Sequence, residues 1–281
     1  MDKLKIDPTS ALFLKWGLKA FNPNAIEAFV KHIDITSADK LYDECSLICN
    51  WYDEVILNRK YFIAKTIEEI LARENQNYTI LNLAAGKTPL AIHLLTRNKE
   101  RITKIIEVDN WGMEEKQEIY DRYYPEISDK IKCISADITS DSFLLFIQQI
   151  INEYFEGNPC IVILEGIIYY LKPDEFIKII KKFNSPKKSN TVIIEYLLHD
   201  SLIKDDRKEI PYKVFEKLKS EMSIETISSY KRDYITTLFN ENGGEFICNK
   251  NLMDMEKERT GTNKYFNGIE EGWIECSVWK L

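Results

Sequence analysis

Acidic residues stand at the ends of several short apolar runs in this chain, where their carboxylates can bind the hydroxyl and amino groups of a nucleoside. Asp109 follows the run at residues 103–108, and a carboxylate after the second strand of an α/β sheet can accept both hydroxyls of a ribose. Asp137 follows the run at residues 131–136 and is placed to accept a hydrogen bond from an adenine amino group. These two residues predict a nucleoside-binding edge.

Two further apolar runs end in the same way. Residues 160–164 (CIVIL) are followed by Glu165-Gly166, and residues 191–194 are followed by Glu195-Tyr196. One such acid alone would be about as consistent with a solvated strand end. Five runs that all end in small or acidic residues indicate the edge at which open α/β sheets bind ligands.

The first run of the series, at residues 80–83, leads into a turn that a ligand can approach closely. Gly86 permits the turn and leaves the backbone accessible, and Pro89 suits the first turn of the helix that follows. The N–H groups at such a helix start have no partner within the helix and face the ligand.

Three kinds of cofactor compete for this turn. The sequence Gly86-Lys87-Thr88 imitates the end of a phosphate-binding P-loop, but the glycine required five positions earlier is Leu81. A dinucleotide fingerprint needs three glycines, of which only Gly86 is present. S-adenosylmethionine carries no phosphate and needs only one close backbone approach, so the pattern favours it. A nucleotide-dependent enzyme remains the alternative.

The order of these elements predicts an α/β fold in which a mostly parallel sheet is wound with helices. Five apolar runs lie about 25 to 30 residues apart with helical segments between them. Ile63, Ile67, Ile70 and Leu71 form an apolar stripe on a helix before the first run. A helix at residues 230–242, a strand at 245–248 and a last strand at 273–279 complete the pattern.

The bulk composition narrows the class of partner. The formal net charge of -7 and the lack of a long basic stripe exclude nucleic acid as an expected substrate. No apolar run approaches the ~18 residues of a membrane span, and no signal-peptide core is visible, so we expect a cytoplasmic protein with no membrane contact. The six cysteines and three histidines show no metal-ligand spacing, which predicts buried thiols and no metal.

Four segments of the chain carry a family resemblance. These segments are ILNLAAGKTPLAIHLL, IIEVDN, ISADIT and VILEGIIYYLKPDEF, and the segment ILNRKYFIAKTIEEIL precedes them. Together they resemble the leucine carboxyl methyltransferase family, which includes the tetracenomycin-type O-methyltransferases. The resemblance implies a class I methyltransferase dependent on S-adenosylmethionine, with a Rossmann-like sheet of seven strands and an antiparallel last strand. It covers most of the first two hundred residues, and EGIIYYL is its most specific part.

The resemblance assigns cofactor contacts residue by residue. It implies that Gly86 lies against the amino-acid part of the cofactor and that Asp109 binds the ribose. Asp137 and Ile138 would hold the adenine, and Glu165 would contact the amino group of the methionine moiety.

The same resemblance implies a positive charge near a carboxylate, supplied by Arg59 or Lys65, or by Lys19. One departure concerns the first turn, where many family members have Gly-x-Asp-Thr-Arg and this chain has Gly86-Lys87-Thr88-Pro89. The missing Asp and Arg alter one side of the predicted pocket.

The chain is expected to form one methyltransferase domain, with a helical lid and lead-in helix at residues 1–75, a cofactor-binding core at 76–200, and a cap insertion with C-terminal strands at 201–281. The cap itself, at residues 197–229, is rich in charge and would cover the methyl acceptor; a solvated surface helix pair is the alternative.

The expected reaction is methyl transfer to an oxygen of a small molecule or of a protein C-terminus. A carboxylate is ionised at neutral pH and needs only a cation such as Arg59 or Lys65 to position it. A phenol needs a general base, for which Tyr169 and His199 are the candidates. This comparison favours a carboxylate. A noncatalytic module that binds the cofactor and a partner protein is a further alternative.

Overall fold

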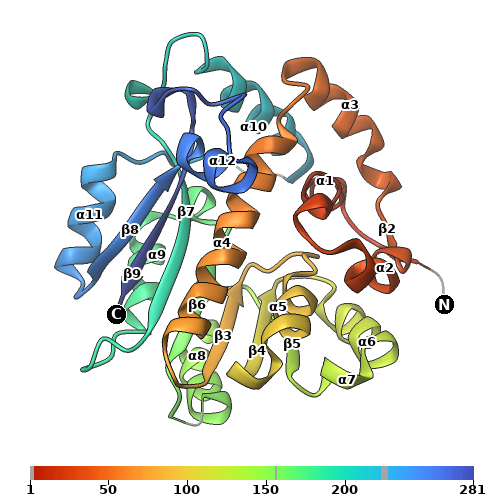
Figure 1. The fold of residues 1–281 in the computed structure, drawn as a ribbon, viewed down its shortest axis with the longest axis vertical. Coiled ribbons are helices and arrows are strands. Elements are labelled where there is room, and N and C mark those ends of the chain that lie inside the picture. Colours follow the sequence, from red (N-terminus) through yellow and green to blue (C-terminus); the bar gives the residue numbers. More distant parts are fainter. Residues whose placement is uncertain (1–2, 156, 223–226) are drawn as a thin grey trace.

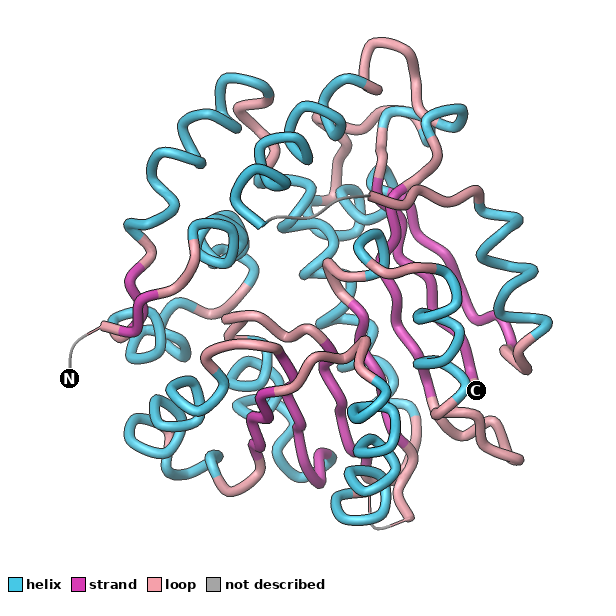
Figure 2. Tube along the Cα trace, turned by 180° about the vertical axis from the view of Figure 1, so that it is seen from behind, coloured by secondary structure: helices cyan, strands magenta, loops and turns pink. Residues whose placement is uncertain are grey.

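The computed structural model describes residues 3–155, 157–222 and 227–281, which form a seven-stranded sheet with helices on both faces (Figures 1 and 2). The strand order is β5-β4-β3-β6-β7-β9-β8. Neighbouring strands are parallel except where β9 pairs with β7 and β8, as the sequence predicted for a late strand. The strands of this sheet are β3 (Tyr78–Leu83), β4 (Ile102–Asp109), β5 (Ile131–Ser135), β6 (Cys160–Leu164), β7 (Thr191–Leu197), β8 (Glu245–Asn251) and β9 (Ile274–Lys280).

The five predicted apolar runs are the strands β3 to β7. All residues of β3, β6 and β7 are buried, which is expected for central parallel strands that are covered on both faces. The register pairs Leu83 with both Val108 and Leu164, so β3, β4 and β6 end at the same level. The residues that follow these strands therefore meet at one edge of the sheet.

The helices lie in two layers around the sheet. α4, α5 and α6 cover one face, while α8, α9 and α11 cover the other (Figures 1 and 2). The helices are α1 (Pro8–Gly17), α2 (Pro23–Lys31), α3 (Asp39–Ile48), α4 (Asp53–Arg73), α5 (Leu90–Asn98), α6 (Met113–Tyr123), α7 (Pro125–Ser128), α8 (Asp141–Tyr154), α9 (Pro173–Lys181), α10 (Glu209–Met222), α11 (Arg232–Glu241) and α12 (Leu252–Thr260).

The predicted apolar stripe lies on α4. Ile63, Ile67 and Leu71 are buried, and Ile70 is partly buried against the core, as the helical spacing indicated. Among the described residues no helix combines the length and the apolar character needed to cross a membrane. All six cysteines are free, and five of them are buried, in agreement with the prediction.

The N-terminal segment lies beyond the carboxyl ends of the strands. Its short strands β1 (Leu4–Lys5) and β2 (Ile33–Asp34) pair in parallel, and Asp7 caps α1 by accepting a hydrogen bond from the Ser10 N–H at 2.8 Å. Figure 1 shows α1, in red, above the loops that follow β3 and β4. This position makes α1 a cover for the ligand-binding edge of the sheet.

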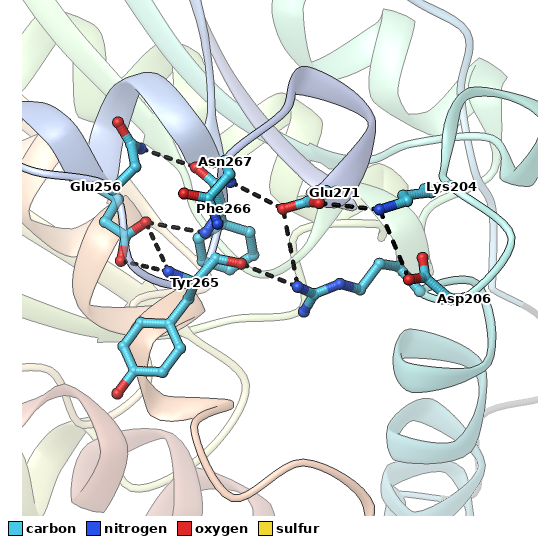
Figure 3. Close-up of polar contacts among 9 residues, drawn as sticks. Lys204, Asp206, Glu256, Tyr265, Phe266, Asn267 and Glu271 are labelled. Atoms are coloured by element: carbon cyan, nitrogen blue, oxygen red, sulfur yellow. Dashed lines mark hydrogen bonds and ion pairs between the residues drawn. The ribbon is translucent and has the colours of Figure 1, made fainter.

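The segment between β7 and α10 (residues 198–208) is bonded to the loop between α12 and β9 (residues 261–273), here called the C-terminal loop, as Figure 3 shows. Lys204 donates to Glu271 at 3.1 Å and lies 3.7 Å from Asp206, while Glu271 also accepts from the Asn267 N–H. Glu256 on α12 accepts hydrogen bonds from the backbone of the same loop. Helix α10, which follows this segment, packs on α3 and α1.

Candidate functional site

A cavity of about 890 Å³ lies at the carboxyl ends of β3, β4, β5 and β6, and α1 and α4 close it. Its volume falls in the range of ~300–1,000 Å³ that holds small-molecule ligands. Five residues predicted to contact a cofactor line this cavity together: Gly86, Asp109, Asp137, Ile138 and Glu165. Strand register explains the convergence, because each of them lies at or just after the carboxyl end of a parallel strand.

The turn after β3 is held open toward the cavity. Ala84 and Gly86 both adopt left-handed backbone angles, with φ of 55° and 54°, and Asp109 Oδ2 accepts a hydrogen bond from the Gly86 N–H at 2.8 Å. A Cβ at Gly86 would meet no atom within 4 Å. The turn therefore leaves space for a ligand at the point where the sequence predicted a close approach.

A buried ion pair supports this turn from below. Lys116 on α6 lies 2.9 Å from Glu107 Oε2 and donates to the Gly86 carbonyl at 3.0 Å. Tyr120 donates its hydroxyl proton to the same Glu107 oxygen at 2.9 Å. Sequence reasoning missed this cluster, although Glu107 inside an apolar strand was a signal that a partner must lie nearby.

Lys87 takes a different role from a P-loop lysine. Its buried side chain lines the cavity, and its ammonium donates to the Trp111 carbonyl at 2.5 Å and lies 5.2 Å from the Trp111 ring. Burial lowers the pKa of Lys87, and neighbouring Lys116 lowers it further. The ammonium of Lys87 is thus already hydrogen-bonded to the backbone of the loop after β4. The turn that carries Lys87 also lacks the first glycine of the phosphate-binding pattern.

Asp137 and Ile138 form another part of the lining. Asp137 Oδ1 accepts hydrogen bonds from the backbone N–H and the hydroxyl of Thr139, at 2.9 and 2.7 Å. Ile138 is buried and presents an apolar side chain to the cavity. An apolar side chain beside a carboxylate acceptor suits a planar base that carries an amino group.

Four charged side chains form a buried ion cluster on the other side of the cavity: Arg59, Lys60, Glu165 and Glu195. Arg59 Nε donates to Glu165 Oε1 at 3.1 Å, and its Nη1 donates to Glu195 Oε1 at 2.9 Å. Lys60 donates to Glu165 Oε1 at 3.0 Å. Glu195 Oε2 accepts from the Gly166 N–H at 2.6 Å, which ties the cluster to the turn after β6.

The pKa shifts in this ion cluster follow from burial and pairing. Burial alone would lower the pKa of Arg59, but Glu195 and Glu165 raise it well above its ordinary value. Burial would raise the pKa of Glu165, but Lys60 and Arg59 hold it below its ordinary value. Burial raises the pKa of Glu195 and lowers that of Lys60.

Three residues that the sequence placed in the site lie elsewhere. Lys65 is 37% exposed and pairs with Glu258 at 3.3 Å, on the far side of α4 from the cavity lining. Lys19 is 78% exposed and lies 3.8 Å from Asp53. His199 caps a short helical turn through Ser201 and does not line the cavity. None of these three residues lines the cavity, so the structure does not bring them together with the other predicted site residues.

Helical geometry explains why Lys60, and not Lys65, reaches the cavity. Lys60 precedes Ile63 by three residues and Ile67 by seven, so it belongs to the buried stripe. Lys65 is two residues from either isoleucine and faces away. The spacing was visible in the sequence, but a lysine on an apolar stripe was not counted as part of it.

Tyr169 lies behind the cavity rather than in its lining. It is buried and shares a hydrogen bond with Arg59, and burial raises its pKa well above the ordinary value. Its neighbour Tyr170 lines the cavity, and burial raises the pKa of that hydroxyl too. Both phenols therefore stay protonated at neutral pH, and a general-base role of Tyr169 stays a prediction from the sequence.

The segment that was expected to form the cap also lies away from the cavity lining. No described residue of 197–229 lines the cavity, because the segment is tied to the C-terminal loop and α10 packs on α3 and α1. Residues 223–226 of the predicted cap lie outside the described part of the chain. The cavity is covered instead by residues 5–21, including Asp7, Thr9 and Phe13.

The lining fits S-adenosylmethionine, the cofactor that the resemblance implies. Asp109 and Asp137 are acceptors for hydroxyl and amino groups, and Glu165 with Lys60 offers opposite charges side by side. Three buried hydroxyls of the lining, those of Thr9, Thr88 and Tyr170, have no hydrogen-bond partner among the described residues. Such unpaired groups are the ones that a polar ligand can satisfy. The described residues contain no cluster of His, Cys, Asp and Glu that could hold a metal ion.

Comparison with known proteins agrees with this geometry. The model of the leucine carboxyl methyltransferase family matches residues 26–184, which is more than half of the chain. No curated protein matches the sequence.

Solved structures share the fold at low sequence identity. A putative methyltransferase from Thermobifida fusca YX is 11% identical with a TM-score of 0.64, covering 92% of this chain and 94% of that one. A DUF574 family protein from Streptomyces avermitilis MA-4680 is 10% identical with a TM-score of 0.63, covering 87% and 90%. Geranyl diphosphate C-methyltransferase from Streptomyces coelicolor A3(2) is 9% identical with a TM-score of 0.50, covering 80% and 78%. The predicted fold of a class I methyltransferase is confirmed.

Proposed function

Because the chain belongs to the leucine carboxyl methyltransferase family, with S-adenosylmethionine as its cofactor, we propose that it methylates an oxygen atom of a small molecule. When bound, the cofactor would supply a methyl group on its sulfonium, which an acceptor oxygen would take by in-line displacement as the S–C bond breaks and S-adenosylhomocysteine leaves. Holding two reactants in line contributes ~7 to 11 kcal/mol to such a reaction. The protein's part is to bind, orient and enclose them.

One observation carries this proposal. Gly86, Asp109, Asp137 and Glu165 come from four different strand ends and line one cavity. In the proposal Asp109 holds the ribose and Asp137 with Ile138 holds the adenine, as the family resemblance implies. Glu165, whose pKa is held low by Lys60 and Arg59, stays ionised and accepts from the cofactor's amino group.

The cover formed by α1 supports a small acceptor over a protein C-terminus. Residues 5–21 contribute much of the lining, so an acceptor must fit beneath this segment. The chemistry of the lining supports an oxygen that ionises without help, since no histidine lines the cavity and Tyr170 is protonated. A carboxylate meets this requirement best, and an acidic phenol is the second choice. A cytoplasmic location stays a prediction from the sequence.

Titration calorimetry tests the cofactor half of the proposal. Wild-type protein and Asp109→Ala are titrated with S-adenosylhomocysteine and, separately, with ATP and magnesium. We expect micromolar binding of S-adenosylhomocysteine that weakens roughly tenfold or more in the variant, because a charge-assisted contact is lost. Binding of ATP alone would overturn the assignment.

A transfer assay tests the acceptor half. Protein is incubated with methyl-labelled S-adenosylmethionine and panels of carboxylic acids and phenols, and the products are then treated with base. A methyl ester releases labelled methanol in base, whereas a methyl ether keeps its label. If the label remains on the product after treatment with base, the acceptor is a phenol rather than a carboxylate. Cofactor binding without any methyl transfer would favour the noncatalytic module.

A further inference from the structure

Two adjacent residues of α4 enter the ion cluster, but their hydrogen-bonding capacity is used to different degrees. Arg59 donates to Glu165 and Glu195 and shares a hydrogen bond with Tyr169, so three protein groups engage its guanidinium. Lys60 has three N–H donors, and among the described residues only Glu165 accepts one of them. Two N–H groups of a buried ammonium that lines the cavity are thus uncommitted.

The carboxylate of Glu165 is also only partly hydrogen-bonded. Both cations bind its Oε1, and its Oε2 accepts no hydrogen bond from the described residues. A cation and an anion that both have free hydrogen-bonding capacity therefore lie next to each other on the cavity wall, with Lys60 Nζ 3.0 Å from Glu165 Oε1. A ligand with a carboxylate and an ammonium on one carbon complements such a pair.

The fold makes room for the Lys60 side chain at one particular place. A Cβ on Gly17 of α1 would lie 2.6 Å from Lys60 Cε and 2.7 Å from Cδ, closer than real Cβ contacts come. Gly17 adopts an ordinary helical backbone angle, so its lack of a side chain serves the lysine stem rather than a turn. The cover helix and α4 thus fix the direction of this cation together.

Charge balance favours a zwitterion over a simple anion. The ion cluster holds two cations and two carboxylates and is neutral as a unit. Binding a carboxylate with its own ammonium keeps it neutral, whereas a bare anion would leave an uncompensated charge in a buried place.

We propose that Lys60 binds the carboxylate of the cofactor's methionine moiety, beside the ammonium that the family resemblance assigns to Glu165, and that Arg59 is a positioning residue for the two glutamates. This inference rests on the proposed function for the identity of the cofactor. It moves to Lys60 the role that the sequence gave to Arg59, Lys65 or Lys19.

The test compares two ligands that differ only in the amino-acid part. S-adenosylhomocysteine carries the carboxylate and the ammonium, and 5′-methylthioadenosine lacks both. Calorimetry is done on wild type, Lys60→Met, Lys60→Arg and, as a matched control on the same helix, Lys65→Met. For Lys60→Met we expect a loss of roughly tenfold or more in affinity for S-adenosylhomocysteine and little change for 5′-methylthioadenosine. Lys60→Arg should restore part of the loss, and Lys65→Met should bind both ligands like wild type.

The outcomes separate this inference from the proposed function. If wild type binds neither ligand, the proposed function fails. If wild type binds both and Lys60→Met keeps its preference for S-adenosylhomocysteine, the inference fails alone. A selective loss in Arg59→Lys without one in Lys60→Met would return the role to Arg59.

A second variant tests the inference independently in case Lys60→Met does not fold. Gly17→Ala keeps every charge but places a methyl group against the lysine stem. We expect it to bind 5′-methylthioadenosine like wild type and to lose part of its affinity for S-adenosylhomocysteine. Equal losses for both ligands, at an unchanged melting temperature, would overturn the inference.

Discussion

Lys116 and Glu107 form an ion pair in which both side chains are fully buried, 2.9 Å apart, directly beneath the turn that faces the cavity. The lysine also donates to the Gly86 carbonyl at 3.0 Å. An ion pair in the core therefore connects α6, β4 and the turn after β3. The shape of the ligand-binding turn depends on residues that no ligand can touch.

We expect Lys116→Met to lower the free energy of unfolding strongly. Removing one partner of a buried pair leaves Glu107 uncompensated, which typically costs about 3–5 kcal/mol. Urea unfolding followed by circular dichroism measures the change. The double variant Lys116→Met with Glu107→Gln should recover part of the loss because no charge is left unpaired. A single variant that unfolds at the wild-type midpoint would contradict this prediction.

Gly86→Ala should weaken ligand binding more than it weakens the fold. The left-handed φ of 54° costs a non-glycine residue ~1–2 kcal/mol, while the new methyl group would enter open space at the cavity. We therefore expect a modest fall in melting temperature and a larger loss of S-adenosylhomocysteine affinity. Unchanged affinity in a folded variant would show that no ligand approaches this turn.

Replacing Lys65 or His199 should have little effect on either binding or stability. Both side chains lie outside the cavity lining and are partly exposed: Lys65 pairs with Glu258, and His199 caps a short helical turn through Ser201. Substitutions at such positions usually change stability by about 0.5 kcal/mol or less. Calorimetry and thermal unfolding of Lys65→Met and His199→Ala check this. A clear loss of methyl transfer in His199→Ala would restore it as a candidate base.

Stability should fall when the pH drops below about 6.5, because of His93 on α5. Burial lowers the pKa of His93 below its ordinary value of 6.5, although Glu68 at 3.4 Å opposes the shift. Below that pH the unfolded chain binds a proton that the folded protein binds less well, so acid favours unfolding. One such group contributes at most ~1.4 kcal/mol per pH unit.

The variant His93→Gln isolates this contribution. Its free energy of unfolding should vary less than that of wild type between pH 7 and 5.5, a range in which ordinary carboxyl groups hardly titrate. Chemical denaturation at a series of pH values provides the comparison. Parallel curves for the two proteins would show that His93 titrates normally in the folded state.

The site residues that follow strand ends could be predicted from the sequence because the physics there is local. An apolar run of five or six residues indicates a buried strand, and a glycine after it indicates a turn. Gly86, Asp109, Asp137 and Glu165 were found in this way, and parallel register then placed them at one edge. The late antiparallel strand β9 was expected from the resemblance and its own alternating pattern.

The partners of charged side chains could not be predicted in the same way. Arg59 and Glu195 are far apart in the sequence and meet only because α4 packs across the sheet. Lys60 and Lys65 look alike in composition, yet one is buried at the cavity and the other pairs with Glu258. The described part of the segment after β7, which was expected to form a cap, does not line the cavity, since only packing decides which helix covers an open edge.

Sequence alone thus determined the fold, the family and the acidic strand ends, because backbone periodicity and turn chemistry act over a few residues. Tertiary structure decided which cations reach the cavity, which segment covers it and which charges neutralise one another. Those outcomes depend on long-range packing, where the cost of burying a charge selects the one arrangement that pairs it.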